Sequence, residues 1–195
     1  MEFSFQELFE ESFPAASPEL RAKFKSFLAS ERTDYKWLFA PRLRDHLSQG
    51  DVLAGIPPFF FDGREVKVSK QLCPFVLLEH TCNMSVDDGE PRNSHYSFIP
   101  LFPFELIVAK GINKQALQKN LIHHKIFLSE IPGFDNQQVG DLNLVGSLES
   151  TWLHRSVRDG GLRRICSLSS NGYFFFLAKL TAHFLRADTS QFQAA

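Results

Sequence analysis

Short apolar runs broken by turn residues fill the chain from Gly50 to Leu148, and this pattern constrains the fold more than any other feature. Val66 and Val68 alternate with charged and polar neighbours soon after the pair Asp62-Gly63, which is typical of a hairpin. Further β-rich runs are "CPFVLLEHT", "SHYSFIPLFPFELIVA" and "KIFLSEI", and one helix-like segment, "NKQALQKNLIHH", precedes the last of them. The pattern predicts a small barrel or a rolled antiparallel sheet.

Helical patterns flank this block on both sides. "SPELRAKFKSFLASE", residues 17–31, begins with Ser17 as an N-cap and Pro18 in the first helical position, and its apolar residues form one stripe. The next stretch continues as a helix that Pro41 should break or kink. Near the C-terminus, residues 169–171 can cap a last helix. Its shared apolar face is predicted to contain Tyr173, Phe176, Leu177, Leu180 and Phe184.

The order of helices, strands and a closing helix indicates an α+β fold. We expect residues 1–49 to form a helical region packed on the sheet, 50–150 to form the barrel, and 151–195 to form a C-terminal helical region. A chain of 195 residues suits one domain with a real core, so these regions should make one structural domain. The 21 phenylalanines, against 3 tyrosines and 2 tryptophans, predict a core of aromatic rings without polar groups.

Composition and charge narrow the class of protein. The formal net charge is -1, so any binding to nucleic acid or anionic lipid requires a local patch. Met1 to Phe13 is acidic and amphipathic, unlike a signal peptide, and the apolar run "YFFFLA" is too short to cross a membrane. Cys73, Cys82 and Cys166 form an odd count without framework spacing. We therefore expect a cytoplasmic protein that does not bind membranes.

The stretch "FVLLEHTCNM", residues 75–84, carries the candidate reactive groups. If the strand continues through it, His80 and Cys82 point the same way, and an imidazole beside a thiolate can activate a nucleophile or bind a soft metal. A zinc site needs about four ligands, and no second close pair of cysteines or histidines completes one, so no metal is expected. His123 and His124 are neighbours that face different directions, which favours polar surface. For Cys82, a small buried side chain at a strand end is the favoured interpretation.

The densest positive segment is "LHRSVRDGGLRR", residues 153–164. Its arginines could bind phosphate and give a salt-sensitive contact with nucleic acid. These candidates are Arg155, Arg158, Arg163 and Arg164. Asp159 reduces the net positive charge of the segment, and no aromatic side chain lies between its arginines to stack on a base. A solvated linker before the last helix is therefore the favoured interpretation. The sequence contains no phosphate-binding glycine loop, nucleophile elbow or HExxH motif.

Four segments of the strand block together resemble the small bacterial barrels of the PemK/MazF-like type: "QGDVLAGIPPFFF", "VLLEHTCNMS", "YSFIPLFPF" and "VGDLNLVGSLE". In those proteins the chain enters through a Gly-Asp-Val or Gly-Asp-Ile strand, and a buried strand with a short polar end follows. Several relatives carry Thr-Cys-Asp where this chain has Thr81, Cys82 and Asn83. The resemblance implies an SH3-like barrel related to ribosome-independent ribonuclease toxins.

Those toxins use an arginine just before the proline of the buried strand and a threonine or serine in the strand that follows. Here the matching places hold Cys73, and Leu101 or Phe102, none of which can stabilise a phosphorane or move a proton. We therefore lean toward a protein that is not an enzyme and needs no cofactor. The alternative is a divergent, metal-independent endoribonuclease toxin, in which His80 would act with Arg155 or Arg158.

The function expected from these patterns is that of a PemK/MazF-like barrel module that binds a partner in a bacterial toxin-antitoxin or phage-defence system. A protein partner is the first expectation and nucleic acid, RNA in particular, is the second. A homodimer is compatible with both.

Overall fold

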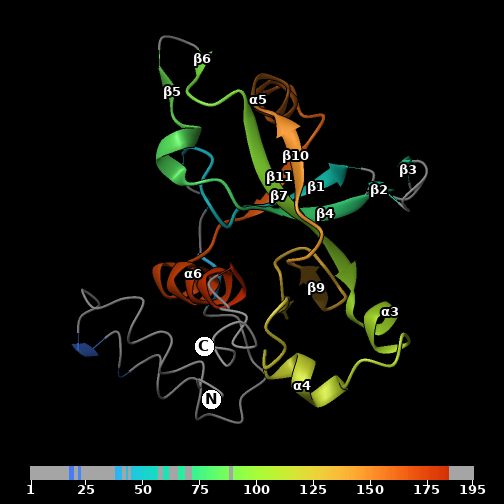
Figure 1. Ribbon diagram of the computed structural model, residues 1–195. Coiled ribbons are helices and arrows are strands. Elements are labelled where there is room, and N and C mark those ends of the chain that lie inside the picture. Colours follow the sequence, from blue (N-terminus) through green and yellow to red (C-terminus); the bar gives the residue numbers. More distant parts are fainter. Residues whose placement is uncertain are drawn as a thin grey trace, which may run out of the picture.

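The computed structural model of the protein describes residues 18–19, 22, 38–40, 43, 45–56, 59–61, 66–68, 72–87 and 90–184 (Figure 1). Of the helix predicted over 17–31, Pro18, Glu19 and Ala22 are described and are helical. The rest of that prediction lies outside the described residues, as does the kink predicted at Pro41.

Seven antiparallel strands form the central sheet. Their order is β11-β1-β4-β7-β9-β8, and β10 pairs with β7. The strands are β1 (Val52–Ile56), β4 (Cys73–Leu77), β7 (His95–Pro103), β8 (Lys125–Leu128), β9 (Gln138–Asp141), β10 (Gly146–Glu149) and β11 (Arg163–Cys166). The helices are α3 (Phe104–Val108), α4 (Lys114–Gln118), α5 (Ser150–Arg158) and α6 (Ser170–Phe184). A 3-10 turn, η2 (Thr81–Met84), follows β4.

Two small hairpins complete the described strands. β2 (Phe59–Phe61) pairs with β3 (Val66–Val68), and β5 (Val86–Asp87) pairs with β6 (Glu90–Pro91). Phe61 lies opposite Val66, so the strands on either side of Asp62-Gly63 pair, whereas the turn predicted at these two residues lies outside the described residues. The predicted helix before "KIFLSEI" and the strand itself are also confirmed, as α4 and β8.

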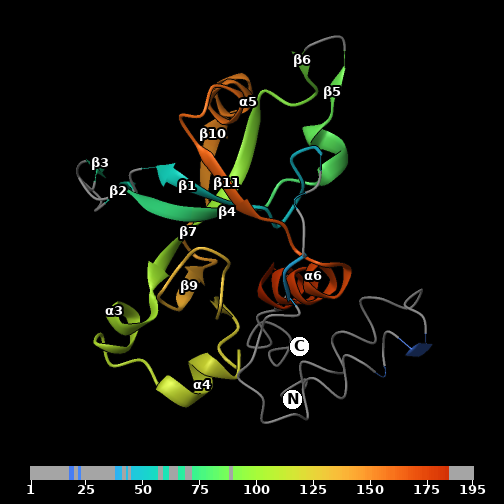
Figure 2. The ribbon, with the colours of Figure 1, turned by 180° about the vertical axis from the view of Figure 1, so that it is seen from behind.

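The central strands carry an apolar core on each face. Val76 and Ile99 belong to the cluster that includes the buried residues of α6, whereas Phe75 and Phe98 belong to the cluster that includes Leu153 of α5. This alternation follows from the two-residue period of a strand, which sends successive side chains to opposite faces. α5 and α6 accordingly lie on opposite sides of the sheet (Figures 1 and 2). The prediction of an aromatic core is confirmed by Phe39, Phe75, Phe98, Phe104, Phe127, Phe175 and Phe176, all of which are buried.

β7 connects the two parts of the sheet. Its first half pairs with β10 on one side and with β4 on the other, and Phe98 lies opposite both Gly146 and Leu77. Its last residues pair with β9. Over the described ranges the sheet ends at β11 and β8, and within those ranges these two strands do not pair to close a barrel. The α+β class is confirmed, and β11, which lies beyond residue 150, belongs to the sheet.

The predicted strand "SHYSFIPLFPFELIVA" is wrong in its second half, because Phe104–Val108 is the helix α3. Pro103 has φ of −54°, and it lacks the N–H that would continue a strand ladder. The N–H of Phe104 instead donates to the carbonyl of Gln137 at 2.9 Å. Proline therefore ends β7 and begins the helix.

For α6 the predicted cap is correct and the predicted buried face is correct in part, since Phe176 is buried and Tyr173 and Leu180 pack against the core. The Oγ of Ser169 accepts from the N–H of Gly172 at 3.0 Å, which confirms a cap at 169–171. The fully covered residues are Gly172, Phe175, Phe176, Ala178 and Lys179. Phe184 of the predicted face is 60% exposed. The run "YFFFLA" is apolar on all sides, so its pattern alone could not select the face that packs on the sheet.

A buried lysine ties α6 to the segment before β8. Lys179 is 1% exposed, and its Nζ donates to the carbonyls of Asn120 and Ile122, both at 2.8 Å. The side chain of Asn120 in turn bonds the backbone of Phe127: its Nδ2 donates to the carbonyl at 3.1 Å, and its Oδ1 accepts from the N–H at 2.7 Å. Burial lowers the pKa of Lys179 to about 7. A neutral amine still has two N–H groups for these carbonyls.

Gly172 allows α6 to approach the chain at Leu38. A Cβ at this position would lie 2.0 Å from the backbone oxygen of Leu38. We expect Gly172→Ala to lower the free energy of unfolding by roughly 1–3 kcal/mol, because overpacking forces the backbone to shift. Urea denaturation measures the change. Gly161→Ala, where the nearest contact of a Cβ is 3.6 Å, is the matched control, and equal losses in the two variants would contradict the explanation.

The buried amine predicts a stability that rises with pH. The unfolded chain keeps the proton of Lys179 up to pH 10.5, whereas the folded chain releases it near pH 7. Between these values the unfolded state binds more protons, so the free energy of unfolding should rise by up to about 1.4 kcal/mol per pH unit. Urea denaturation between pH 7 and 8.5 measures this slope, which should flatten in Lys179→Met. A slope that persists unchanged in the variant would assign it to other groups.

Candidate nucleic-acid interface

α5 follows β10 in the chain, packs on one face of the sheet and leads through a turn into β11. The helix begins where the Oε2 of Glu149 accepts from the N–H of Trp152 at 2.8 Å, and this side chain caps the first turn. Leu153 is fully buried in the core on this face, and Val157 packs against that core. One side of the helix is thus fixed to the sheet, and the opposite side is free to hold polar groups.

The exposed side of α5 combines an indole ring with arginines. Trp152 is 43% exposed, and Arg155 and Arg158 follow it at spacings of three residues, so the three side chains form one ridge. Arg163, the first residue of β11, is also exposed, but it follows Leu162, which is buried in the core beneath α5, and therefore points away from that core. We call Trp152, Arg155 and Arg158 the α5 surface.

Sequence reasoning missed Trp152 and misread its surroundings. The positive segment was taken to begin at residue 153, so the aromatic side chain directly before it was not counted. A window one residue longer would have found it. The interpretation of 153–164 as a solvated linker is wrong, because these residues form most of α5, a tight turn at Gly160-Gly161 and the start of β11. The two glycines form the turn, and Gly160 has φ of +78°. Because glycines are also common in linkers, they made the segment resemble one in composition.

Asp159 weakens the positive charge of the α5 surface only modestly. Its Oδ1 lies 3.0 Å from the Nε of Arg158, and the two side chains are 56% and 74% exposed. Exposed ion pairs of this kind contribute little and exchange readily with other partners. Arg158 therefore stays available to an anionic ligand.

Arg164, the fourth predicted arginine, lies inside the protein. Its side chain is 10% exposed, and its Nε lies 2.8 Å from the Oδ2 of Asp51, which is fully buried. Its Nη2 donates to the Oγ of Ser167 at 3.0 Å. Burial raises the pKa of Asp51, against the lowering effect of Arg164. The structure thus separates two adjacent arginines, with Arg163 on the surface and Arg164 in a buried ion pair.

His154 joins α5 to the sheet beneath it. Its Nε2 lies 3.1 Å from the hydroxyl of Tyr96, which is fully buried on β7. Burial lowers the pKa of His154 and raises that of Tyr96 to about 12, so both side chains are neutral near pH 7. A neutral hydrogen-bonded pair fixes the orientation of the helix without burying a charge.

The predicted pairing of His80 and Cys82 on one strand face is wrong. β4 ends at Leu77, and Cys82 belongs to the 3-10 turn that follows. His80 caps this turn, since its Nδ1 accepts from the N–H of Cys82 at 3.3 Å. Both side chains are exposed, so the favoured interpretation of Cys82 as a buried side chain is also wrong. The imidazole interacts with the backbone of Cys82, and no contact with its sulfur is found among the described residues.

Polar side chains hold the end of the 75–84 stretch in place. Gln49 reaches it from the turn before β1: its N–H donates to the Oγ1 of Thr81 at 3.1 Å and its Nε2 donates to the carbonyl of Leu78 at 2.6 Å. The Oε1 of Glu79 accepts from the Nδ2 of Asn83 at 2.6 Å and from that of Asn93 at 3.4 Å. These groups are therefore occupied in bracing the end of β4.

The places that match the toxin residues lie in the cores. Leu101 is fully buried on β7, and Phe102 packs against the same core. Cys73 is buried at the start of β4, and burial raises the pKa of its thiol to about 11. A protonated, covered thiol and two apolar side chains serve packing at these positions.

Metal-ligating side chains are scattered over the described ranges, where no group of three or more His, Cys, Asp or Glu residues is arranged to hold a metal ion. His123 and His124 do lie close together, with 3.4 Å between ring nitrogens. They occupy the turn before β8, away from His80.

Comparison with protein-family models and with curated proteins found no match to this chain. Within the part of the chain that the structure describes, no helix has the length and apolarity required to cross a membrane.

The contrast between the adjacent arginines is testable. We expect Arg164→Ala to lower the free energy of unfolding by about 3–5 kcal/mol, because it leaves the Asp51 carboxylate buried without its counter-charge. Arg163→Ala should change it by no more than about 0.5 kcal/mol, as for most surface substitutions. Denaturation of both variants at neutral pH measures the difference. Equal effects would show that Asp51 does not depend on Arg164.

Proposed function

We propose that this protein is a non-enzymatic binding module that holds single-stranded nucleic acid on the α5 surface. The observation that carries the proposal is the exposed Trp152 one helical turn from the exposed Arg155 on a helix fixed to the sheet. An indole face can stack on any base, and guanidinium groups bind phosphate.

Charge supports nucleic acid over a protein as the ligand. Arg155 and Arg158 concentrate positive charge on one side of α5 in a chain whose formal net charge is -1. A local basic patch of this kind attracts a polyanion. Exposed tryptophan and arginine are also enriched at protein interfaces, so a protein ligand is the other outcome of the test below.

Single-stranded ligands suit the surface better than duplexes. Bases of an unpaired strand can turn toward an aromatic ring, whereas those of a duplex are already stacked. Trp152, Arg155 and Arg158 follow one another along the exposed side of α5, so a strand can contact them in series. This arrangement fits a strand that lies across the helix.

The resemblance to PemK/MazF-like proteins is part of this proposal. It supplies an SH3-like barrel as the finer description of the fold and a bacterial toxin-antitoxin or phage-defence system as the setting. The absence of catalysis is supported by the apolar surroundings of Cys73 and Leu101 at the places that match the toxin residues. The exposed position of His80 on a turn that it caps also favours a structural role.

Binding should depend on stacking and on salt in a defined way. We expect a short single-stranded RNA to bind to the α5 surface. A plot of log K against log salt should have a slope of about −1.4, from roughly 0.7 per phosphate contact at two arginines. Trp152→Ala should weaken binding by about 1–3 kcal/mol, while Trp152→Phe should retain most of the affinity. Arg155→Ala should reduce the slope by about 0.7. Fluorescence anisotropy at several salt concentrations measures these values.

Lys119→Ala is the control, because this exposed lysine lies at the end of α4, whose Leu117 packs in the core on the other face of the sheet. An unchanged affinity in Trp152→Ala, or an effect of Lys119→Ala equal to that of Arg155→Ala, would contradict the proposal. Failure to bind RNA or DNA at low salt, together with capture of a protein ligand that Trp152→Ala abolishes, would assign the surface to a protein. Cleavage of the RNA without added metal, lost by about 10² to 10⁴ in His80→Ala, would favour the endoribonuclease alternative.

A further inference from the structure

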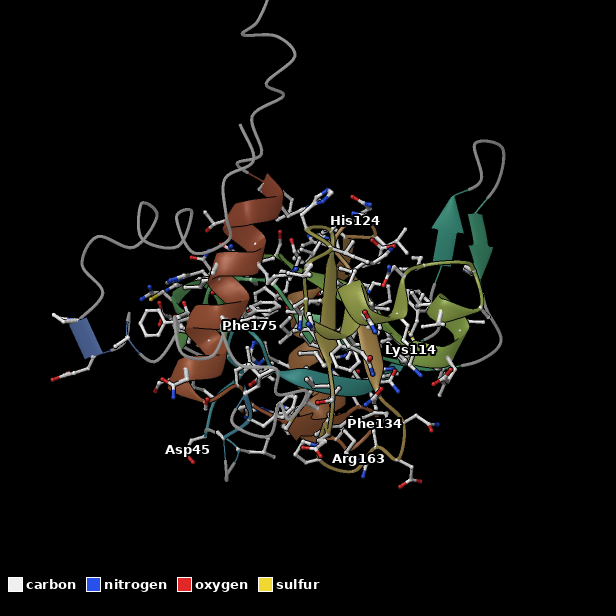
Figure 3. All side chains as sticks on the ribbon, turned by 90° about the horizontal axis from the view of Figure 1, so that it is seen from below. Asp45, Lys114, His124, Phe134, Arg163 and Phe175 are labelled. Atoms are coloured by element: carbon white, nitrogen blue, oxygen red, sulfur yellow. The ribbon has the colours of Figure 1, made fainter. Side chains whose placement is uncertain are left out.

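Three histidines meet where the C-terminal end of α6 contacts the turn before β8. The Nδ1 of His124 lies 3.4 Å from the Nε2 of His123, and the ring centroids are 4.7 Å apart. His183, in the last turn of α6, stacks on His123 with 6.3 Å between centroids. Figure 3 shows His124 near this end of the helix. The cluster therefore joins two segments that are far apart in the sequence.

Among the described residues, the charged groups that act on His124 are mostly cationic in acid. They are Lys125 on β8, His183 and, once it is protonated below its pKa of about 7, Lys179 on α6. Asp141 on β9 is the anion that faces His124 among the described residues, and it already forms an ion pair with Lys125. An added proton at His124 thus meets more positive than negative charge among these groups.

Neutral imidazoles can pack in this way, but protonated ones would repel each other. Histidine side chains ordinarily gain their charge between pH 5 and 8, and like charges a few ångströms apart disfavour each other strongly when water is partly excluded. The Nδ1 of His183 is buried and has no hydrogen-bond partner among the described residues.

We propose that His123, His124 and His183 form a latch that holds the C-terminal turn of α6 on the sheet at neutral pH and releases it in mild acid. α6 covers the core that contains Phe176, so its release exposes apolar surface. The latch is independent of the α5 surface, which lies on the opposite side of the sheet.

The direction of the pH effect follows from His124. Burial, and then Lys125, lower the pKa of His124 in the folded protein. The open or unfolded segment therefore takes up protons more readily than the closed one. The closed form is favoured above the ordinary histidine pKa of 6.5 and loses this advantage as the pH falls through that value.

Hydrogen exchange of the full chain at pH 7.5 and 5.5 tests the latch, with rates corrected for the intrinsic effect of pH. In peptides that cover 176–184, we expect protection at pH 5.5 to be lower than at pH 7.5. The loss should be about tenfold for each unit by which the histidine pKa values differ between the open and the closed segment. Peptides that cover β4 should keep their protection. His183→Gln and His123→Gln should reduce this loss, because glutamine retains hydrogen bonding without titrating. His95→Gln, an exposed histidine on β7, is the control and should behave as the wild type.

Equal protection of α6 at the two pH values, or the same loss in His183→Gln as in the wild type, would overturn the proposal. If a variant loses the protection of α6 already at pH 7.5, a second measurement on the wild type tests the latch: an NMR pH titration of the histidine C–H resonances. Titration of the three residues as a coupled group, with protection lost over the same pH range, supports the latch. Independent titration of each residue contradicts it.

Discussion

The buried ion pair between Asp51 and Arg164 connects β1 with β11, which are the first and last strands of the described residues. The turn around Asp51 connects these two strands to β4 in the middle of the sheet. The N–H of Gly50 donates to the carbonyl of Leu77 at 2.8 Å, and the N–H of Leu77 donates to that of Asp51 at 3.0 Å. Gly50 has φ of +83°, and a Cβ there would lie 2.2 Å from a carbon of Leu168. The Gln-Gly-Asp sequence thus fixes β1, β4 and β11 at one point, and glycine is required at its centre.

This junction also determines what α5 can present. The helix follows β10 directly and leads through a short turn into β11, so both of its ends are held by strands of the same sheet. Leu153 fixes its inner side, and His154 adds a directional bond to Tyr96. Side chains on the outer side therefore start from a rigid backbone, which lowers the entropy cost of ordering them against a ligand.

The sequence pattern was sufficient to predict those elements whose formation depends on residues close together in the chain. The alternation at Val66 and Val68, the cap at Ser169 and the strand at 125–128 were all predictable, because two-residue periods and side-chain caps involve neighbours in the sequence. The end of β4 was not, since the partner that stabilises the following turn is Gln49, which lies far away in the sequence.

In the candidate site, too, some features could be predicted from neighbouring residues and others depend on residues far away in the sequence. A concentration of arginines was visible in the sequence, but Arg163 and Arg164 cannot be told apart without knowing that Asp51 lies beneath one of them. The inward face of α6 was equally hidden, because a phenylalanine-rich run offers several apolar faces. Its choice depends on Gly172 meeting Leu38 and on Lys179 reaching two carbonyl groups.

The hydrogen bonds of Asn120 have a consequence for how copies of this protein meet. β8 is the last strand in the order of the sheet, and the N–H and carbonyl of Phe127 are engaged by the Asn120 side chain. A terminal strand with free backbone groups invites pairing with a strand of another molecule, which is the first step toward aggregation. Because the Asn120 side chain already bonds the backbone N–H and carbonyl of Phe127, these two groups cannot pair with a strand of another molecule.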